Sequence, residues 1–148
     1  MEFVDTNILI YANDQSAGRK RELAGALLLR LNDTDEGALS IQVLTEFYEA
    51  VTRKRIVPDR EAAEIMWDYS HWTLHHPGIE HLMDAVELRS RYGITWFDAL
   101  ILNSALQLGC TTFVERGLFA WAEVWPPHDP QSFHCLTPDA VVWRLIAK

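Results

Sequence analysis

The sequence has few cysteines and no long apolar run. Cys110 and Cys135 are its only cysteines, which excludes a disulfide-rich secreted scaffold and leaves open one disulfide between the two. No stretch of about 18 uncharged apolar residues occurs, so no membrane-spanning helix is expected. The first residues also lack the basic segment and apolar stretch of a secretory signal. We therefore expect a cytoplasmic protein that contacts no membrane.

Positive charge is scarce as well. The chain has 13 Lys and Arg against 21 Asp and Glu, a formal net charge of −8, which argues against a protein that coats nucleic acid through bulk charge. This net charge is still compatible with an enzyme that binds nucleic acid at a local basic strip around an acidic metal centre. Basic clusters at 19–21 and 53–55 contain the candidate phosphate or RNA contacts Arg19, Lys20, Arg53 and Lys54. A solvated helix face is the simpler explanation of each cluster.

The order of local patterns predicts the fold class. The chain of 148 residues is long enough for one domain with a hydrophobic core, and we expect a single domain over 1–148. Short β-type runs at 2–4, 38–41, 110–114 and 133–136 alternate with longer helical patterns. Those patterns lie at 19–31 and 43–51, from 59 to a break at 76–78, at 79–92, at 95–108 and after Thr137. This alternation favours an α/β fold with a central parallel sheet flanked by helices.

Local signals define several helix ends. Asp59 is a predicted N-cap, Thr95-x-x-Asp98 forms a capping-box pattern, and Gly93 is a plausible C-terminal stop. In the helix over 79–92, the spacing of apolar residues predicts which side chains face the core. The expected inward-facing residues are Leu82, Met83 and Val86.

Three acidic residues stand at or just past expected strand-to-helix junctions. Asp5 ends the first strand, Glu46 follows the second strand, and Asp98 lies in the first turn of its helix. In a parallel sheet these junctions share the carboxyl edge, where such folds bind ligands. Carboxylates gathered there would repel one another unless a cation neutralised them, and oxygen ligands suit Mg²⁺ or Mn²⁺. The pattern is consistent with a divalent metal site.

Each acid also has a purely structural explanation. Asp5 could be a turn cap, Glu46 a solvated helix residue, and Asp98 only the acidic member of its capping box. These explanations are weaker when taken together. Glu46 stands among apolar residues that include Val43 and Phe47, and a carboxylate on that face is costly to bury without a partner or metal.

Three segments resemble the motifs of PIN-domain nucleases. They are Phe-Val-Asp-Thr-Asn-Ile-Leu-Ile-Tyr-Ala at 3–12, Ser-Ile-Gln-Val-Leu-Thr-Glu-Phe-Tyr at 40–48, and Tyr-Gly-Ile-Thr-Trp-Phe-Asp-Ala-Leu-Ile at 92–101. Their order and spacing agree with the family, and the resemblance covers nearly the whole chain. Within the family the chain most resembles the VapC-type toxins of toxin–antitoxin pairs.

The resemblance implies a three-layer PIN-like fold and a function. It implies a Mg²⁺- or Mn²⁺-dependent endoribonuclease that hydrolyses RNA phosphodiester bonds as the toxin of a toxin–antitoxin pair. By motif position, Asp5, Glu46 and Asp98 are the catalytic metal ligands, and Asn7 is a supporting polar residue. The implied partners are an RNA substrate, an antitoxin protein and a second copy of the chain. We expect the helices between 43 and 72 to carry partner or dimer contacts.

One part of the family pattern is missing. Where the family has Ser-Glu-Asp-Leu, this chain reads Glu115-Arg116-Gly117-Leu118, so Gly117 replaces a fourth acid. Glu115 could substitute for that acid as a metal ligand, and Arg116 could contact a phosphate or neutralise the acidic pocket. The alternative interpretation is a PIN-like RNA- or protein-binding module with a degenerate metal site.

Overall fold

The computed structural model describes residues 1–114. Glu115, Arg116, Gly117, Cys135, the expected strand at 133–136 and the helix after Thr137 lie outside the described residues. Within residues 1–114 the central element is a parallel sheet with strand order β3-β2-β1-β4. Its strands are β1 (Glu2–Val4), β2 (Gly37–Ser40), β3 (Thr73–His75) and β4 (Thr112–Val114).

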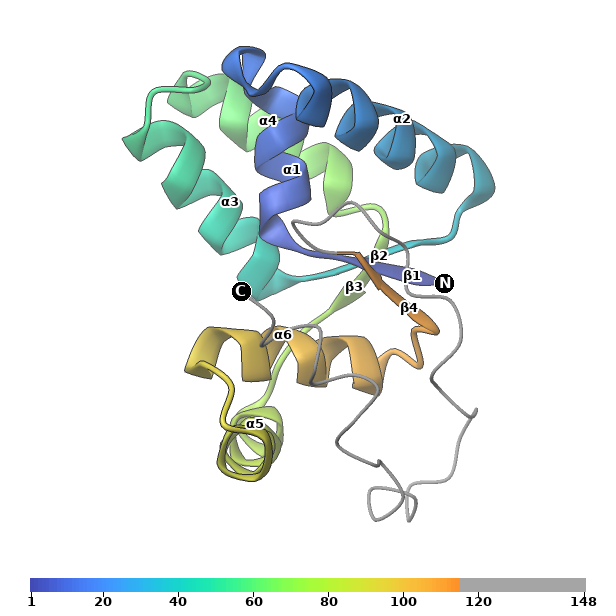
Figure 1. The fold of residues 1–148 in the computed structure, drawn as a ribbon, viewed down its shortest axis with the longest axis vertical. Helices are drawn as coiled ribbons and strands as arrows, with labels where there is room; N and C mark the ends of the chain where they lie inside the picture. The colour runs from blue at the N-terminus through green and yellow to red at the C-terminus, as the bar shows by residue number, and fades with distance from the viewer. Residues whose placement is uncertain (115–148) are drawn as a thin grey trace.

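Helices cover both faces of this sheet, as Figure 1 shows. On one face lie α1 (Thr6–Asn13), α2 (Arg19–Thr34), α3 (Ile41–Arg53) and α4 (Asp59–Tyr69), with a short 3₁₀ turn, η1 (Gln15–Ala17), between α1 and α2. On the other lie α5 (Ile79–Tyr92) and α6 (Trp96–Gln107). The predicted α/β fold with three layers is confirmed. None of the helices in residues 1–114 is both long and apolar enough to cross a bilayer.

The main core lies between the sheet and the first helical layer. Phe3 and Val4 of β1 are fully buried, as are Val43, Phe47 and Val51 of α3. The spacing of the α3 residues is that of one helical face, and each large apolar side chain buried there contributes about 1.5–3 kcal/mol. This packing fixes the rotation of α3 about its axis, and with it the direction of the other side chains of the helix.

A second cluster joins α5 to α6. Ala85, Leu88 and Tyr92 of α5 are buried in it, and the Asn103 side-chain amide of α6 donates to the backbone carbonyl of His81 over 3.0 Å. The predicted inner face of α5 is therefore wrong, since Leu82, Met83 and Val86 are exposed. The buried face of α5 is instead the one that carries Ala85 and Leu88 and includes the hydrogen bond at His81.

Two further local predictions fail and two are confirmed. The N-cap of α4 is Pro58 rather than Asp59, which is the first helical residue. Strand β3 was read as helix, because its structure comes from pairing with β2 rather than from local preference. Gly93 ends α5 in the left-handed region at φ 65°, and Thr95 caps α6 by accepting a hydrogen bond from the Asp98 N–H. Both are as predicted.

Two glycines with opposite surroundings give a test of this packing. A methyl group at Gly37 would overlap the ring of Trp72, whereas one at Gly25 in α2 meets open space. We expect Gly37→Ala to lower the free energy of unfolding by about 1–3 kcal/mol through overpacking. Gly25→Ala should raise it by about 0.5–1 kcal/mol, because alanine loses less entropy in a helix.

Urea denaturation of both variants beside the wild type measures these changes. Equal stability of Gly37→Ala and wild type would show that Trp72 does not pack against the start of β2 as described.

Candidate metal centre

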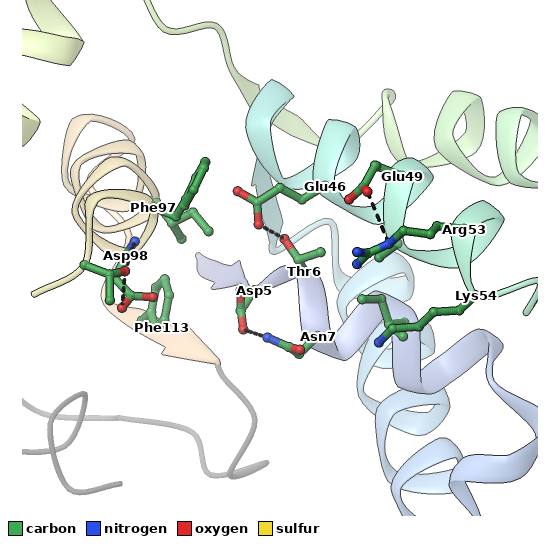
Figure 2. A pocket seen from close by; sticks show the side chains of 14 residues that line it. Asp5, Thr6, Asn7, Glu46, Glu49, Arg53, Lys54, Phe97, Asp98 and Phe113 are labelled. Atoms are coloured by element: carbon green, nitrogen blue, oxygen red, sulfur yellow. Dashed lines mark hydrogen bonds and ion pairs between the residues drawn. The ribbon is translucent and has the colours of Figure 1, made fainter.

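A pocket of about 500 Å³ opens at the carboxyl edge of the sheet. Figure 2 shows α3 on one side of it and α6 on the other, with the start of α1 between them. Its polar lining residues are Asp5, Thr6, Asn7, Glu46, Glu49, Arg53, Lys54, Thr95 and Asp98, and its apolar ones are Ile10, Ala50, Phe97, Ile101 and Phe113. The three acids singled out in the sequence therefore line the same pocket.

Asp5 is held where β1 ends and α1 begins. Its backbone N–H donates to the Val114 carbonyl of β4 over 2.9 Å, which ties it to the ends of two neighbouring strands. The Asn7 side-chain amide donates to the Asp5 carboxylate over 2.7 Å. Asn7, which the sequence analysis proposed as a supporting residue, thus orients the first acid.

Glu46 projects into the pocket from the second turn of α3. The Gln42 amide donates to one of its carboxylate oxygens over 2.6 Å, and the Thr6 hydroxyl donates to the other over 3.4 Å. Burial raises the pKa of Glu46, and the charges of Asp5 and Asp98 raise it further. The two hydrogen bonds oppose this shift by favouring the charged form.

Asp98 reaches the pocket from the other layer. Its backbone N–H donates to the Thr95 hydroxyl over 3.2 Å, and that hydroxyl donates to its carboxylate over 2.7 Å. The sequence pattern groups Asp98 with the strand-to-helix junctions, but α5 separates β3 from α6. Asp98 lies at the carboxyl edge for a different reason. Helix α6 directly precedes β4 and runs antiparallel to it across the face of the sheet. The N-terminus of α6 therefore lies near the carboxyl end of β4.

The donor set of this pocket suits a hard divalent cation. Asp5, Glu46 and Asp98 offer carboxylate oxygens, and no histidine or cysteine lines the pocket among residues 1–114. Oxygen ligands of this kind fit Mg²⁺ or Mn²⁺. Within residues 1–114, however, no group of three or more histidine, cysteine, aspartate or glutamate side chains lies close enough together to hold a metal ion.

The predicted basic contacts separate into two groups. Arg53 and Lys54 line the pocket, and Arg53 also pairs with Glu49 over 3.2 Å. Arg19 and Lys20 lie at the start of α2 and are not among the lining residues. The Lys20 ammonium instead lies 4.9 Å from the centre of the Tyr11 ring.

Two residues at the pocket, Gln42 and Phe97, were not predicted from the sequence. Gln42 lies one helical turn before Glu46, and that i, i+4 spacing could have identified it as a partner of the acid. Phe97 precedes Asp98 and lines the pocket with an exposed ring. Apolar periodicity does not identify it, because the continuous stretch 99–105 of α6 is buried.

Comparison with known proteins gives a family match and fold neighbours. A family model described as the PIN domain matches residues 3–117. A chain of a toxin–antitoxin complex from Klebsiella pneumoniae is 22% identical, with a TM-score of 0.60 over 78% of this chain and 86% of that one. VapC20 of Mycobacterium tuberculosis, described as a sarcin–ricin loop cleaving toxin, is 18% identical, with a TM-score of 0.63 over 80% and 92%. At these identities the likeness shows the fold alone. No curated protein sequence matches significantly.

The crowding of negative charge predicts a gain of stability when one charge is removed. In metal-free protein, Glu46→Gln should raise the melting temperature, because it relieves burial and repulsion of the carboxylate while its remaining oxygen can still accept from Gln42. Glu49→Gln is the matched control one turn along α3. Its carboxylate is exposed and paired with Arg53, so this variant should gain nothing.

Differential scanning fluorimetry in EDTA measures both variants. A Glu46→Gln protein that melts at or below the wild-type temperature would contradict the described electrostatics.

Proposed function

The chain belongs to the PIN domain family, and from this premise we propose that it is a Mg²⁺- or Mn²⁺-dependent endoribonuclease that hydrolyses RNA phosphodiester bonds. One observation carries the proposal. Carboxylates from three separate elements, Asp5, Glu46 and Asp98, line one open pocket with oxygen donors and adjacent cations. A purely structural role for each acid does not explain why they converge.

The proposed roles follow from the contacts of each side chain. Asp5, Glu46 and Asp98 would hold the ion. A bound ion of this kind supplies an activated water and neutralises charge that develops on the phosphate. The supporting residues Asn7, Gln42 and Thr95 keep the three carboxylates in fixed orientations through their hydrogen bonds. Supporting contacts of this type preserve metal-site geometry.

Arg53 and Lys54 are the proposed contacts to the RNA backbone. They come from the end of α3 and line the side of the pocket opposite Asp98, as Figure 2 shows. In a chain with a net charge of −8, such local cations would attract phosphate at the site without making the whole surface bind nucleic acid. Arg53 would exchange its contact with Glu49 for a phosphate.

We extend the proposal to a toxin of a toxin–antitoxin pair that acts in the cytoplasm as a homodimer. The fold neighbours include a chain of a toxin–antitoxin complex and a toxin, which supports this class. The acidic net charge would suit a basic antitoxin. The packed pair α3 and α4 is the proposed partner or dimer surface, and Trp67 of α4 is 68% exposed there.

The direct test compares two matched carboxylates. Asp98→Asn should reduce Mn²⁺-dependent cleavage of a structured RNA mixture by at least about 100-fold, since loss of even supporting residues at metal sites costs 10–100-fold. Asp59→Asn is the control, because Asp59 also lies in the first turn of its helix but is exposed and outside the pocket. It should cleave like the wild type.

Gel analysis of cleavage, with circular dichroism to check folding, gives the readout. Wild-type cleavage by Asp98→Asn would rule out the mechanism. A wild-type chain that binds RNA without cutting it would instead favour the degenerate binding module.

A further inference from the structure

One aromatic side chain that lines the pocket, Phe97, is largely exposed. Phe97 is 59% exposed although it belongs to α6, whose residues 99–105 are all buried. Its neighbour Trp96 packs against the α5–α6 cluster, and Phe97 is left at the mouth of the pocket. Exposing a phenyl ring forgoes the free energy that burial would give. A ligand with an apolar face would recover this free energy by covering the ring.

The surroundings of Phe97 restrict what that ligand can be. Figure 2 shows Phe97 next to Asp98 on one side of the pocket and Arg53 and Lys54 on the other, with Asp5 and Glu46 between them. A ligand that spans this pocket must present a flat apolar group to Phe97 and negative charge to the cations. A nucleotide does both, because its base has a π-face and its phosphate is anionic.

A protein partner fits these surroundings less well. Protein contacts of this kind use contiguous apolar patches, and most of the residues that line this pocket are polar or charged. The exposed apolar residues of α5, which are Ile79, Leu82, Met83 and Val86, are not among the lining residues.

We propose that Phe97 is the platform on which an unpaired base next to the scissile phosphate stacks. This inference rests on the proposed ribonuclease function and adds a base-contacting residue to it. A paired base is covered by its neighbours in the helix, so its face is not available to a side chain. Phe97 therefore contributes to the binding of an unpaired strand or loop and not to that of a continuous duplex.

The test uses binding of a fluorescein-labelled 12-nucleotide single strand of mixed sequence, measured with EDTA present so that no cleavage occurs. Phe97→Leu should weaken binding about 5- to 150-fold, the range expected for loss of one base–aromatic stack. Phe97→Trp should bind at least as tightly as the wild type. Leu29→Ala, which shortens an exposed apolar side chain of α2 outside the pocket, is the control and should bind normally.

A second readout reports stacking itself. With 2-aminopurine placed at successive positions of the same strand, the wild type and Phe97→Trp should quench its fluorescence at one preferred position, and Phe97→Leu should not. Mn²⁺ affinity should be equal in all four proteins, which separates a role in base binding from damage to the metal centre.

The outcomes are distinguishable. Equal RNA affinity of Phe97→Leu and the wild type would overturn the role of Phe97 but leave the proposed function standing. A Phe97→Leu defect confined to the binding of a protein partner would also overturn the role of Phe97 alone. A wild type that binds no RNA under any condition would contradict the proposed function and this inference together. If Phe97→Leu weakened the binding of single strands and duplexes equally, the stacking role of Phe97 would also be overturned. Stacking of an unpaired base predicts weaker binding of single strands only.

Discussion

The burial of the Glu46 carboxylate beside the charges of Asp5 and Asp98 is the constraint on which the rest of the site depends. Burial and the two neighbouring charges both raise the pKa of Glu46, so the folded chain keeps this carboxylate in place at a cost in stability. Hydrogen bonds from Gln42 and Thr6 hold it there. A divalent cation would turn the repulsion into attraction, because each carboxylate would then face a positive charge.

The fold provides the rigidity that this arrangement requires. Asp5 is tied through its backbone to the end of β4, and the buried face of α3 fixes the direction of Glu46. Asp98 comes from the opposite layer, positioned by the Thr95 cap at the start of α6. The three acids therefore line one pocket at the carboxyl edge of the sheet although they are far apart in the sequence.

The sequence predicted the parts of the molecule that depend on local chemistry. The parallel sheet, the cap at Thr95, the stop at Gly93 and the acids of the pocket all leave patterns in neighbouring residues. Features that depend on contacts between elements distant in the sequence were not predicted. Strand β3 exists because it pairs with β2, and α5 turned Ala85 inward rather than Leu82 because of its contact with α6. Phe97 was missed because an exposed aromatic is recognisable only once its surroundings are known.

The central claim is that the pocket is a metal centre, and calorimetric titration of Mn²⁺ into the purified, partner-free chain tests it most directly. The account predicts saturable binding by the wild type that is lost in Asp5→Asn and retained in Asp33→Asn, whose exposed carboxylate lies in α2 and outside the pocket. Undiminished binding by Asp5→Asn, or no binding by the wild type, would contradict it.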